Sequence, residues 1–189
     1  MQRNCYRVAL NCLLFTLIVT CGISVPEIMA TESFDEDKLK VAFINNFLKF
    51  TTWPEAAFES PESELVLCSL GKDPLSGGLK ALANRKVRDR VIRLLNLASP
   101  DEPEIRNTPC HVLFIPEDYP GQDGLITQLA GAPLLIVGEG NTFITKGGVI
   151  GLKLVGNKVK FDVNLRSAGN NKIVLSSLLL QLANQVYEG

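Results

Sequence analysis

The sequence lacks the residue patterns that mark most classes of enzyme. It contains a single histidine, His111, so histidine-rich metal sites are excluded and a Ser-His-Asp triad would depend on that one ring. No GxSxG elbow, CxxC pair, Walker loop or HExxH sequence occurs anywhere in the 189 residues. We therefore predict a protein that is not an enzyme and that binds no metal and no cofactor.

The sequence also has no strong charge bias and no long apolar run. It carries 19 basic and 20 acidic side chains, a balance that gives no electrostatic attraction for nucleic acid. The longest apolar run covers residues 8–23, about 16 residues, which is short of the roughly 20 needed to span a bilayer. The remaining composition, with 46% hydrophobic residues, is typical of one globular domain.

The N-terminal segment has the three parts of a secretory signal. Arg3 and Arg7 precede the apolar run, and the small residue Ala30 closes the segment. We expect residues 1–30 to be a signal peptide cleaved near Ala30, which leaves a mature α/β domain of residues 31–189 in the periplasm. An uncleaved membrane anchor is the alternative, and the short apolar run counts against it.

Cysteine use depends on that cleavage. Removal of the signal discards Cys5, Cys12 and Cys21, and only Cys68 and Cys110 remain. An even pair in an oxidising compartment favours one disulfide, with two buried free thiols as the alternative. Lipid attachment at Cys21 is a further alternative, but the threonine before this cysteine fits that modification poorly.

Strand and helix patterns alternate through the middle of the chain. Ser33 followed by Glu36 matches a capping box at the start of the first helix. Helical spacing of apolar residues covers 34–50, 74–83 and 121–130. Short apolar runs predict buried strands at 65–70, 91–95, 111–115 and 134–137. This alternation is typical of βαβ units with a parallel sheet.

The last third of the chain changes character. Residues 149–155 and 158–165 flank a Gly-Asn pair and predict a β-hairpin. Residues 173–186 place leucines on one helical face and predict a C-terminal helix. The fold class that follows is a single three-layer α/β domain, with a mostly parallel sheet, a C-terminal β-hairpin and helices on both faces.

Two groups of side chains are candidates for ligand or partner contact. Asp162, Asn164 and Arg166 alternate along the last predicted strand and form a polar row, which is either simply solvated or contacts a small molecule. Trp53, with Phe58 nearby, is either an exposed aromatic contact or part of a turn that packs on the core.

Two further features have a plain structural interpretation. Cys110 and His111 are adjacent on a predicted strand, so their side chains point to opposite faces and do not form a nucleophile and base pair. We expect a structural role for His111. The glycine-rich segment 138–141 follows a strand and could hold an anion, but it has too few glycines for a nucleotide fingerprint and a turn is favoured.

Several segments together resemble the YfiR/HmsC-like family of exported bacterial proteins. The resemblance covers nearly the whole mature domain and is carried by Val41–Phe47 with Thr52–Pro54, Cys68–Leu75, Cys110–Ile115, Val159–Leu165 and Leu175–Ala183.

The resemblance implies a non-enzymatic periplasmic regulator. It implies direct repression of an inner-membrane diguanylate cyclase or a similar membrane signalling protein, with effects on cyclic-di-GMP and biofilm formation. An outer-membrane lipoprotein is implied as a second partner, and a homodimer is left open. Cys68 and Cys110 match the bridging pair of the family.

Two alternatives to this function stay open. The first is a periplasmic sensor without a dedicated cyclase partner, which binds a small ligand at the carboxyl ends of the strands. The second is a cryptic enzyme, and it ranks last because no nucleophile with a positioned base can be named.

Overall fold

A computed structural model describes residues 32–71, 74–99 and 109–188. The predicted signal peptide and its cleavage site lie outside these residues. Within them, no helix combines the length and the apolar character that a bilayer span requires.

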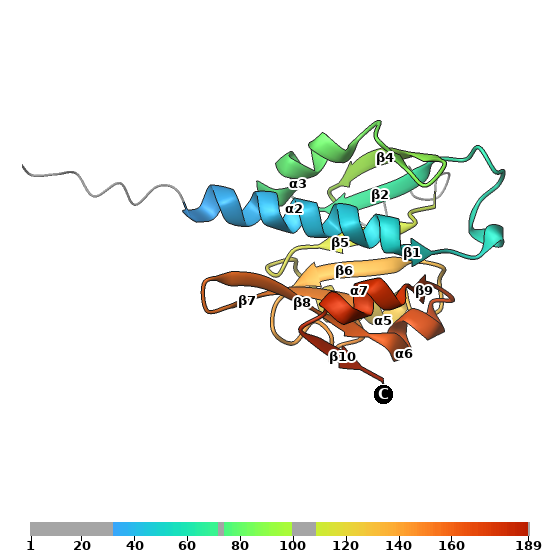
Figure 1. Cartoon of the computed structure of the whole chain (residues 1–189). Helices are drawn as coiled ribbons and strands as arrows, with labels where there is room; N and C mark the ends of the chain where they lie inside the picture. The colour runs from blue at the N-terminus through green and yellow to red at the C-terminus, as the bar shows by residue number, and fades with distance from the viewer. Residues whose placement is uncertain (1–31, 72–73, 100–108, 189) are drawn as a thin grey trace, which may run out of the picture. The chain divides into compact units, whose positions relative to one another are not determined.

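The described chain alternates strands with short helices (Figure 1). In chain order the elements are α2 (Glu32–Phe50), β1 (Thr51–Thr52), η1 (Glu55–Ala57), β2 (Leu65–Leu70), α3 (Pro74–Leu79), η2 (Lys80–Leu82), β3 (Lys86–Val87), β4 (Arg90–Leu97), β5 (Val112–Ile115), α5 (Gln122–Gln128), β6 (Leu135–Glu139), β7 (Ile150–Val155), β8 (Lys158–Asn164), α6 (Leu165–Asn170), β9 (Val174–Leu175), α7 (Ser177–Leu182) and β10 (Gln185–Tyr187).

The main sheet is mixed and mostly parallel. Its strand order is β10-β8-β7-β6-β5-β2-β4-β3, and β1 pairs with β9 separately. Strands β4, β2, β5, β6 and β7 run parallel, whereas β8 returns antiparallel to β7. The chain starts at β2, moves outward to β4 and then crosses to β5, which is the order of a doubly wound sheet. The predicted parallel sheet and C-terminal hairpin are confirmed.

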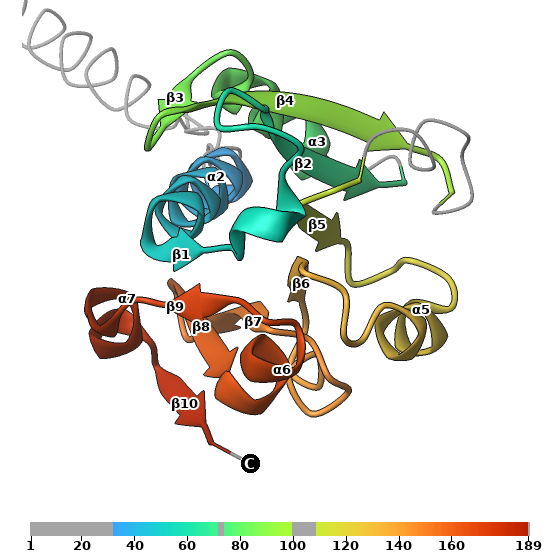
Figure 2. The ribbon, with the colours of Figure 1, turned by 90° about the vertical axis from the view of Figure 1, so that its right-hand side faces the viewer.

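Helices cover both faces of the curled sheet. Viewed along its axis, α2 lies inside the curve, and α5 lies on the opposite face beside β5 and β6 (Figure 2). Phe43 and Phe47 of α2 contact Phe161 of β8, with ring centroids 5.5 and 4.9 Å apart. All six residues of β2 are buried, so both faces of this strand are covered. The predicted three-layer α/β architecture is confirmed.

Two helix predictions need correction. Glu32 and Ser33 are both part of the first helix, so Ser33 is not at the cap position. The predicted helix over 173–186 is three elements, β9, α7 and β10. Ser176 caps α7 by accepting a hydrogen bond from the Leu179 N–H, and the extended backbone of Ala183 ends it. The flanking residues pair with β1 and β8 and so leave the helical path.

Candidate functional site

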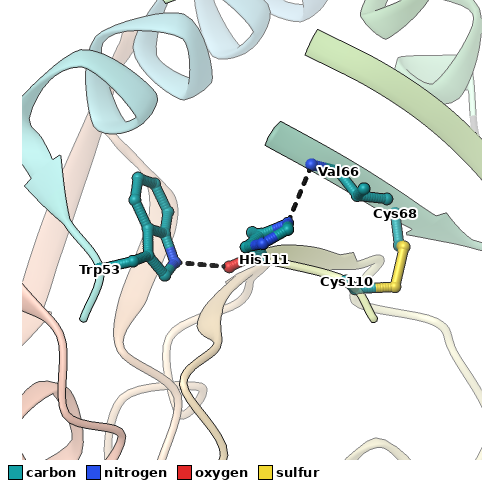
Figure 3. Close-up of a disulfide and its surroundings, with 5 residues drawn as sticks. All are labelled: Trp53, Val66, Cys68, Cys110 and His111. Carbon is teal, nitrogen blue, oxygen red and sulfur yellow. Dashed lines mark hydrogen bonds between the residues drawn. A yellow bond between two sulfur atoms is a disulfide. The ribbon is translucent and has the colours of Figure 1, made fainter. Parts of the chain in front are cut away.

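A disulfide, a histidine and two aromatic side chains cluster near the amino ends of the parallel strands. Cys68 of β2 is joined to Cys110, which precedes β5, and the two Cα atoms are 5.8 Å apart (Figure 3). The bridge forms because β2 and β5 are neighbours at the point where the sheet changes its winding direction. We call this edge of the sheet the amino end.

His111 is fixed by the backbone on both sides of its ring. Its Nδ1 accepts a hydrogen bond from the Val66 N–H at 3.0 Å, and its Nε2 lies 2.9 Å from the Ala57 carbonyl oxygen. An acceptor at Nδ1 and a donor at Nε2 define the neutral imidazole. Burial lowers the pKa of His111, the bond to Ala57 opposes this effect, and the charge of Arg90 adds to the lowering. The ring therefore serves as a structural link.

Aromatic side chains from the turn after α2 pack against this histidine. The indole Nε1–H of Trp53 donates to the His111 carbonyl oxygen at 2.9 Å, and Trp53 is buried in the core (Figure 3). Phe58 stacks on the imidazole with ring centroids 4.3 Å apart. The Arg90 guanidinium carbon lies 3.6 Å from the Phe58 centroid, so Phe58 is held between a cation and an imidazole. Of the two interpretations of Trp53, an exposed aromatic contact or a turn that packs on the core, the structure shows the second.

Arg90 also holds the loop that follows η1. Its Nη1 donates to the carbonyl oxygens of Ser60 at 3.0 Å and Ser63 at 2.7 Å. Hydrogen bonds of Trp53, His111 and Arg90 therefore hold the segment 53–63 against the amino end of the sheet.

Cavities surround this segment. Cavities of about 320, 250 and 220 Å³ lie at the amino end, and each is lined by Phe58 or His111 or both. A cavity of about 180 Å³ lies at the carboxyl ends of β5, β6 and β7, which we call the carboxyl end. Open α/β sheets usually bind ligands at the carboxyl ends of their strands, and the sequence analysis placed a possible ligand there. The three larger of these four cavities lie instead at the amino end.

The carboxyl end is dominated by ion pairs. The Lys40 ammonium lies 2.5 Å from a Glu139 oxygen and 2.6 Å from a Glu36 oxygen. Burial alone would lower the pKa of Lys40, but hydrogen bonds and charges from the two glutamates outweigh burial, so this pKa is raised. Lys153 pairs with Asp162 of the adjacent strand β8.

The predicted polar row on the last strand is not formed. Asp162 is buried, and it accepts hydrogen bonds from Lys153 and Asn184. Strand β8 ends at Asn164, whose side chain caps α6 by accepting from the Ser167 N–H. Arg166 consequently lies in α6, exposed, and not on the strand. The prediction that the three share one strand face was wrong because a helix begins where the alternation was assumed to continue.

The glycine-rich segment 138–141 is explained by packing. A Cβ at Gly138, or at Gly148 opposite, would collide with the Phe143 ring, which is buried between them. Gly140 has φ +106°, a left-handed conformation in which side chains are rarely found. These contacts account for the glycines as parts of a turn, the favoured interpretation of the sequence.

The histidine and the two cysteines of this cluster are already engaged with other groups of the protein. Both ring nitrogens of His111 are engaged by backbone groups, and the sulfurs of Cys68 and Cys110 are bonded to each other. In the ranges that the structure describes, no group of three or more His, Cys, Asp or Glu side chains is placed to hold a metal ion.

Sequence reasoning missed Arg88 and Arg90. They flank Asp89 in the tight turn between β3 and β4, where Val87 pairs with Arg90. Two-residue hairpin turns usually show Asn or Gly, and neither is present here. The contacts of these arginines depend on the sheet order, which brings this turn beside the end of α2.

The fold and this site define a class: a doubly wound α/β domain in which a disulfide and an aromatic cluster fasten the amino end of the sheet. The chain belongs to the YfiR/HmsC-like family, because residues 37–184 match the sequence profile of that family. This is a family of regulatory, non-catalytic proteins. A search of curated proteins found no match.

Solved structures share the fold at low sequence identity. A conserved domain protein from Vibrio cholerae matches with 11% identity and a TM-score of 0.52, over 79% of this chain and 60% of its own. An ABC domain from Streptococcus pneumoniae, crystallised in complex with L-Trp, matches with 10% identity and a TM-score of 0.51, over the same shares of the two chains. The chain thus spans about 60% of the length of these proteins, and the likeness shows the fold alone.

Proposed function

We propose that this protein is a periplasmic regulator that represses an inner-membrane diguanylate cyclase by direct contact. Repression lowers cyclic-di-GMP and limits biofilm formation, and sequestration by an outer-membrane lipoprotein relieves it. The observation that carries the proposal is family membership over residues 37–184. The export signal predicted for residues 1–30 supports it, because it places the mature domain on the periplasmic side of the membrane.

The helix α7 supplies a surface suited to such a partner. Leu178 and Leu182 lie one helical turn apart on the same face, and they are 57% and 66% exposed. Their neighbour Leu179 is buried and anchors the helix. Neighbouring exposed leucines favour an interaction site. Arg166 of helix α6, the exposed member of the predicted contact residues, remains a proposed contact.

A capture experiment with matched variants tests this interface. The tagged protein is expressed with its signal in the native host, inner membranes are solubilised, and captured proteins are identified by mass spectrometry. We expect a diguanylate cyclase with the wild-type protein and its loss with Leu178→Ser/Leu182→Ser. The control variant Leu154→Ser/Val155→Ser changes an apolar pair on β7 that is 51% and 42% exposed, and it should retain the cyclase.

Two results would contradict the proposal. If deletion of the gene left cellular cyclic-di-GMP unchanged, the protein would not repress a cyclase. If both variant pairs retained the cyclase equally, the contact would not involve α7.

A further inference from the structure

The cavity of about 320 Å³ at the amino end has an apolar floor. It lies between the end of α2, the turn that joins β3 to β4, and the segment from Glu55 to Pro61. Its volume is at the lower end of the range for small-molecule sites. The floor is formed by Leu48, Trp53, Leu65 and Val87, all of them buried.

Two arginines stand at the rim of this floor. Arg88 donates from Nε to the Lys49 carbonyl oxygen at 3.2 Å and from Nη1 to the Thr52 hydroxyl at 3.0 Å. Arg90 donates only to carbonyl oxygens, through Nη1. All of these acceptors are uncharged. Within the described residues, neither guanidinium lies within 4.0 Å of a carboxylate, so both charges lack a counter-ion.

The acidic residues at the rim do not cancel this charge. Glu55 and Asp89 also line the cavity, but both are exposed and screened by water. Arg90 is half-buried on the face of Phe58, where the local dielectric is lower and its charge acts more strongly. Arg88 is exposed as well, so the half-buried guanidinium of Arg90 is the least screened of the four charges that line the cavity.

One wall of the cavity carries an unsatisfied polar group. The positive φ of Arg88, +49°, belongs to the two-residue turn between β3 and β4, because turns of this length need such a conformation. Thr51, in the same cavity wall, has a buried hydroxyl with no hydrogen-bond partner in the described structure. Buried polar atoms without a partner are uncommon in folded proteins, and a group satisfied by a bound molecule is one explanation for them.

We propose that this cavity binds a small organic carboxylate with an apolar body. The body lies on the apolar floor beside Trp53, and the carboxylate takes the free N–H groups of Arg88 and Arg90 as its counter-ion. The planar guanidinium suits this role because it presents parallel N–H donors to the two carboxylate oxygens. This proposal is independent of the proposed function. The carboxylate site is expected whether or not the protein represses a cyclase.

The test uses three probes with the same phenylpropyl skeleton and different charge. Wild-type protein purified from the periplasm is titrated with 3-phenylpropionate, 3-phenylpropan-1-ol and 3-phenylpropylamine. Trp53 is the one tryptophan of the chain and lines the cavity, so its fluorescence reports occupancy without any substitution. We expect saturable binding of the carboxylate, at least tenfold tighter than that of the alcohol, and no binding of the amine. Equal binding of all three, or of none, would overturn the proposal.

Two variants that each remove one arginine charge test whether the carboxylate binds at this cavity. Arg88→Gln should weaken carboxylate binding at least tenfold while the melting temperature stays near that of the wild type. The control is Arg93→Gln, which removes an exposed arginine of β4 that pairs with Glu64 and lies outside this cavity. It should change the affinity less than twofold. If Arg93→Gln weakened binding as much as Arg88→Gln, the effect would be one of net charge and the site would be refuted.

Discussion

The two ends of the parallel sheet are held together by different interactions. The amino end is fastened by a disulfide, by hydrogen bonds from the His111 ring to the backbone, and by stacking on Phe58. The carboxyl end is fastened by ion pairs of Lys40 with Glu139 and of Lys153 with Asp162.

Because of this difference, the two ends of the sheet should respond to different solution conditions. A disulfide and a neutral imidazole are insensitive to salt but depend on an oxidising compartment and on a pH that leaves the ring unprotonated. Ion pairs depend on the charge of both partners and weaken with added salt where they are exposed. The larger cavities lie at the amino end, where covalent and aromatic contacts hold the walls in place.

Removal of the disulfide, which fastens the amino end, should lower the free energy of unfolding more than any other change. The sequence separation of Cys68 and Cys110 is 42 residues, and loss of that constraint on the unfolded chain costs about 4 kcal/mol. Urea unfolding of Cys68→Ala/Cys110→Ala measures it, and reduction of the wild-type protein should match the variant. A loss below about 1 kcal/mol, well under the usual range, would mean that the bridge does not stabilise the amino end.

Loss of the imidazole should rank second. His111→Phe keeps an aromatic ring against Phe58 but leaves the Val66 N–H and the Ala57 carbonyl without partners. Buried groups left unsatisfied cost about 1–3 kcal/mol each, so we expect a destabilisation of at least about 2 kcal/mol in the same urea assay. Wild-type stability in this variant would show that the two hydrogen bonds are dispensable.

The ion pairs of the carboxyl end should contribute less. Lys40→Met removes the ion pairs with Glu36 and Glu139, which the lysine makes from a side chain that is only 14% exposed, and we expect a loss of about 1–2 kcal/mol. The control is Lys146→Met, which breaks the pair with Asp123 at a site where the lysine is 38% exposed. That change should cost less than about 0.5 kcal/mol. Equal losses would remove the distinction between buried and exposed pairs.

The acid dependence of stability should show the smallest of these effects. The pKa of His111 is lowered in the folded state, so at pH values below about 6.5 the unfolded chain binds a proton that the folded ring does not. His111 therefore reduces stability progressively as the pH falls below about 6.5, and has no such effect above it. Urea unfolding from pH 5 to 8 should show a shallower acid loss for His111→Phe than for the wild type. Parallel curves would contradict the neutral, buried imidazole.

Sequence patterns predicted the parts of the fold whose local and tertiary preferences agree. Strand β2 is covered on both faces, so it appears as an uninterrupted apolar run. The β7–β8 hairpin has Gly156, at φ +61°, in its turn and could be located from that residue. The C-terminal region was mistaken for one helix because its leucine spacing is helical, whereas pairing with β1 and β8 decides the structure.

The site was less predictable, because its members come from separate parts of the chain. Compartment and count favoured a disulfide between Cys68 and Cys110, and the structure contains that bridge. The stacking of Phe58 between His111 and Arg90 left no local signal, since it follows from the placement of β4 and β5 on either side of β2.

The central claim is that the exported protein acts from the periplasm on a membrane cyclase. The most direct measurement is cellular cyclic-di-GMP in a deletion strain that expresses either the full chain or residues 31–189 retained in the cytoplasm. We predict that the full chain lowers cyclic-di-GMP and that the retained chain, at equal abundance, leaves it unchanged. An unchanged level with the exported protein, or an equal decrease with both, would contradict the account.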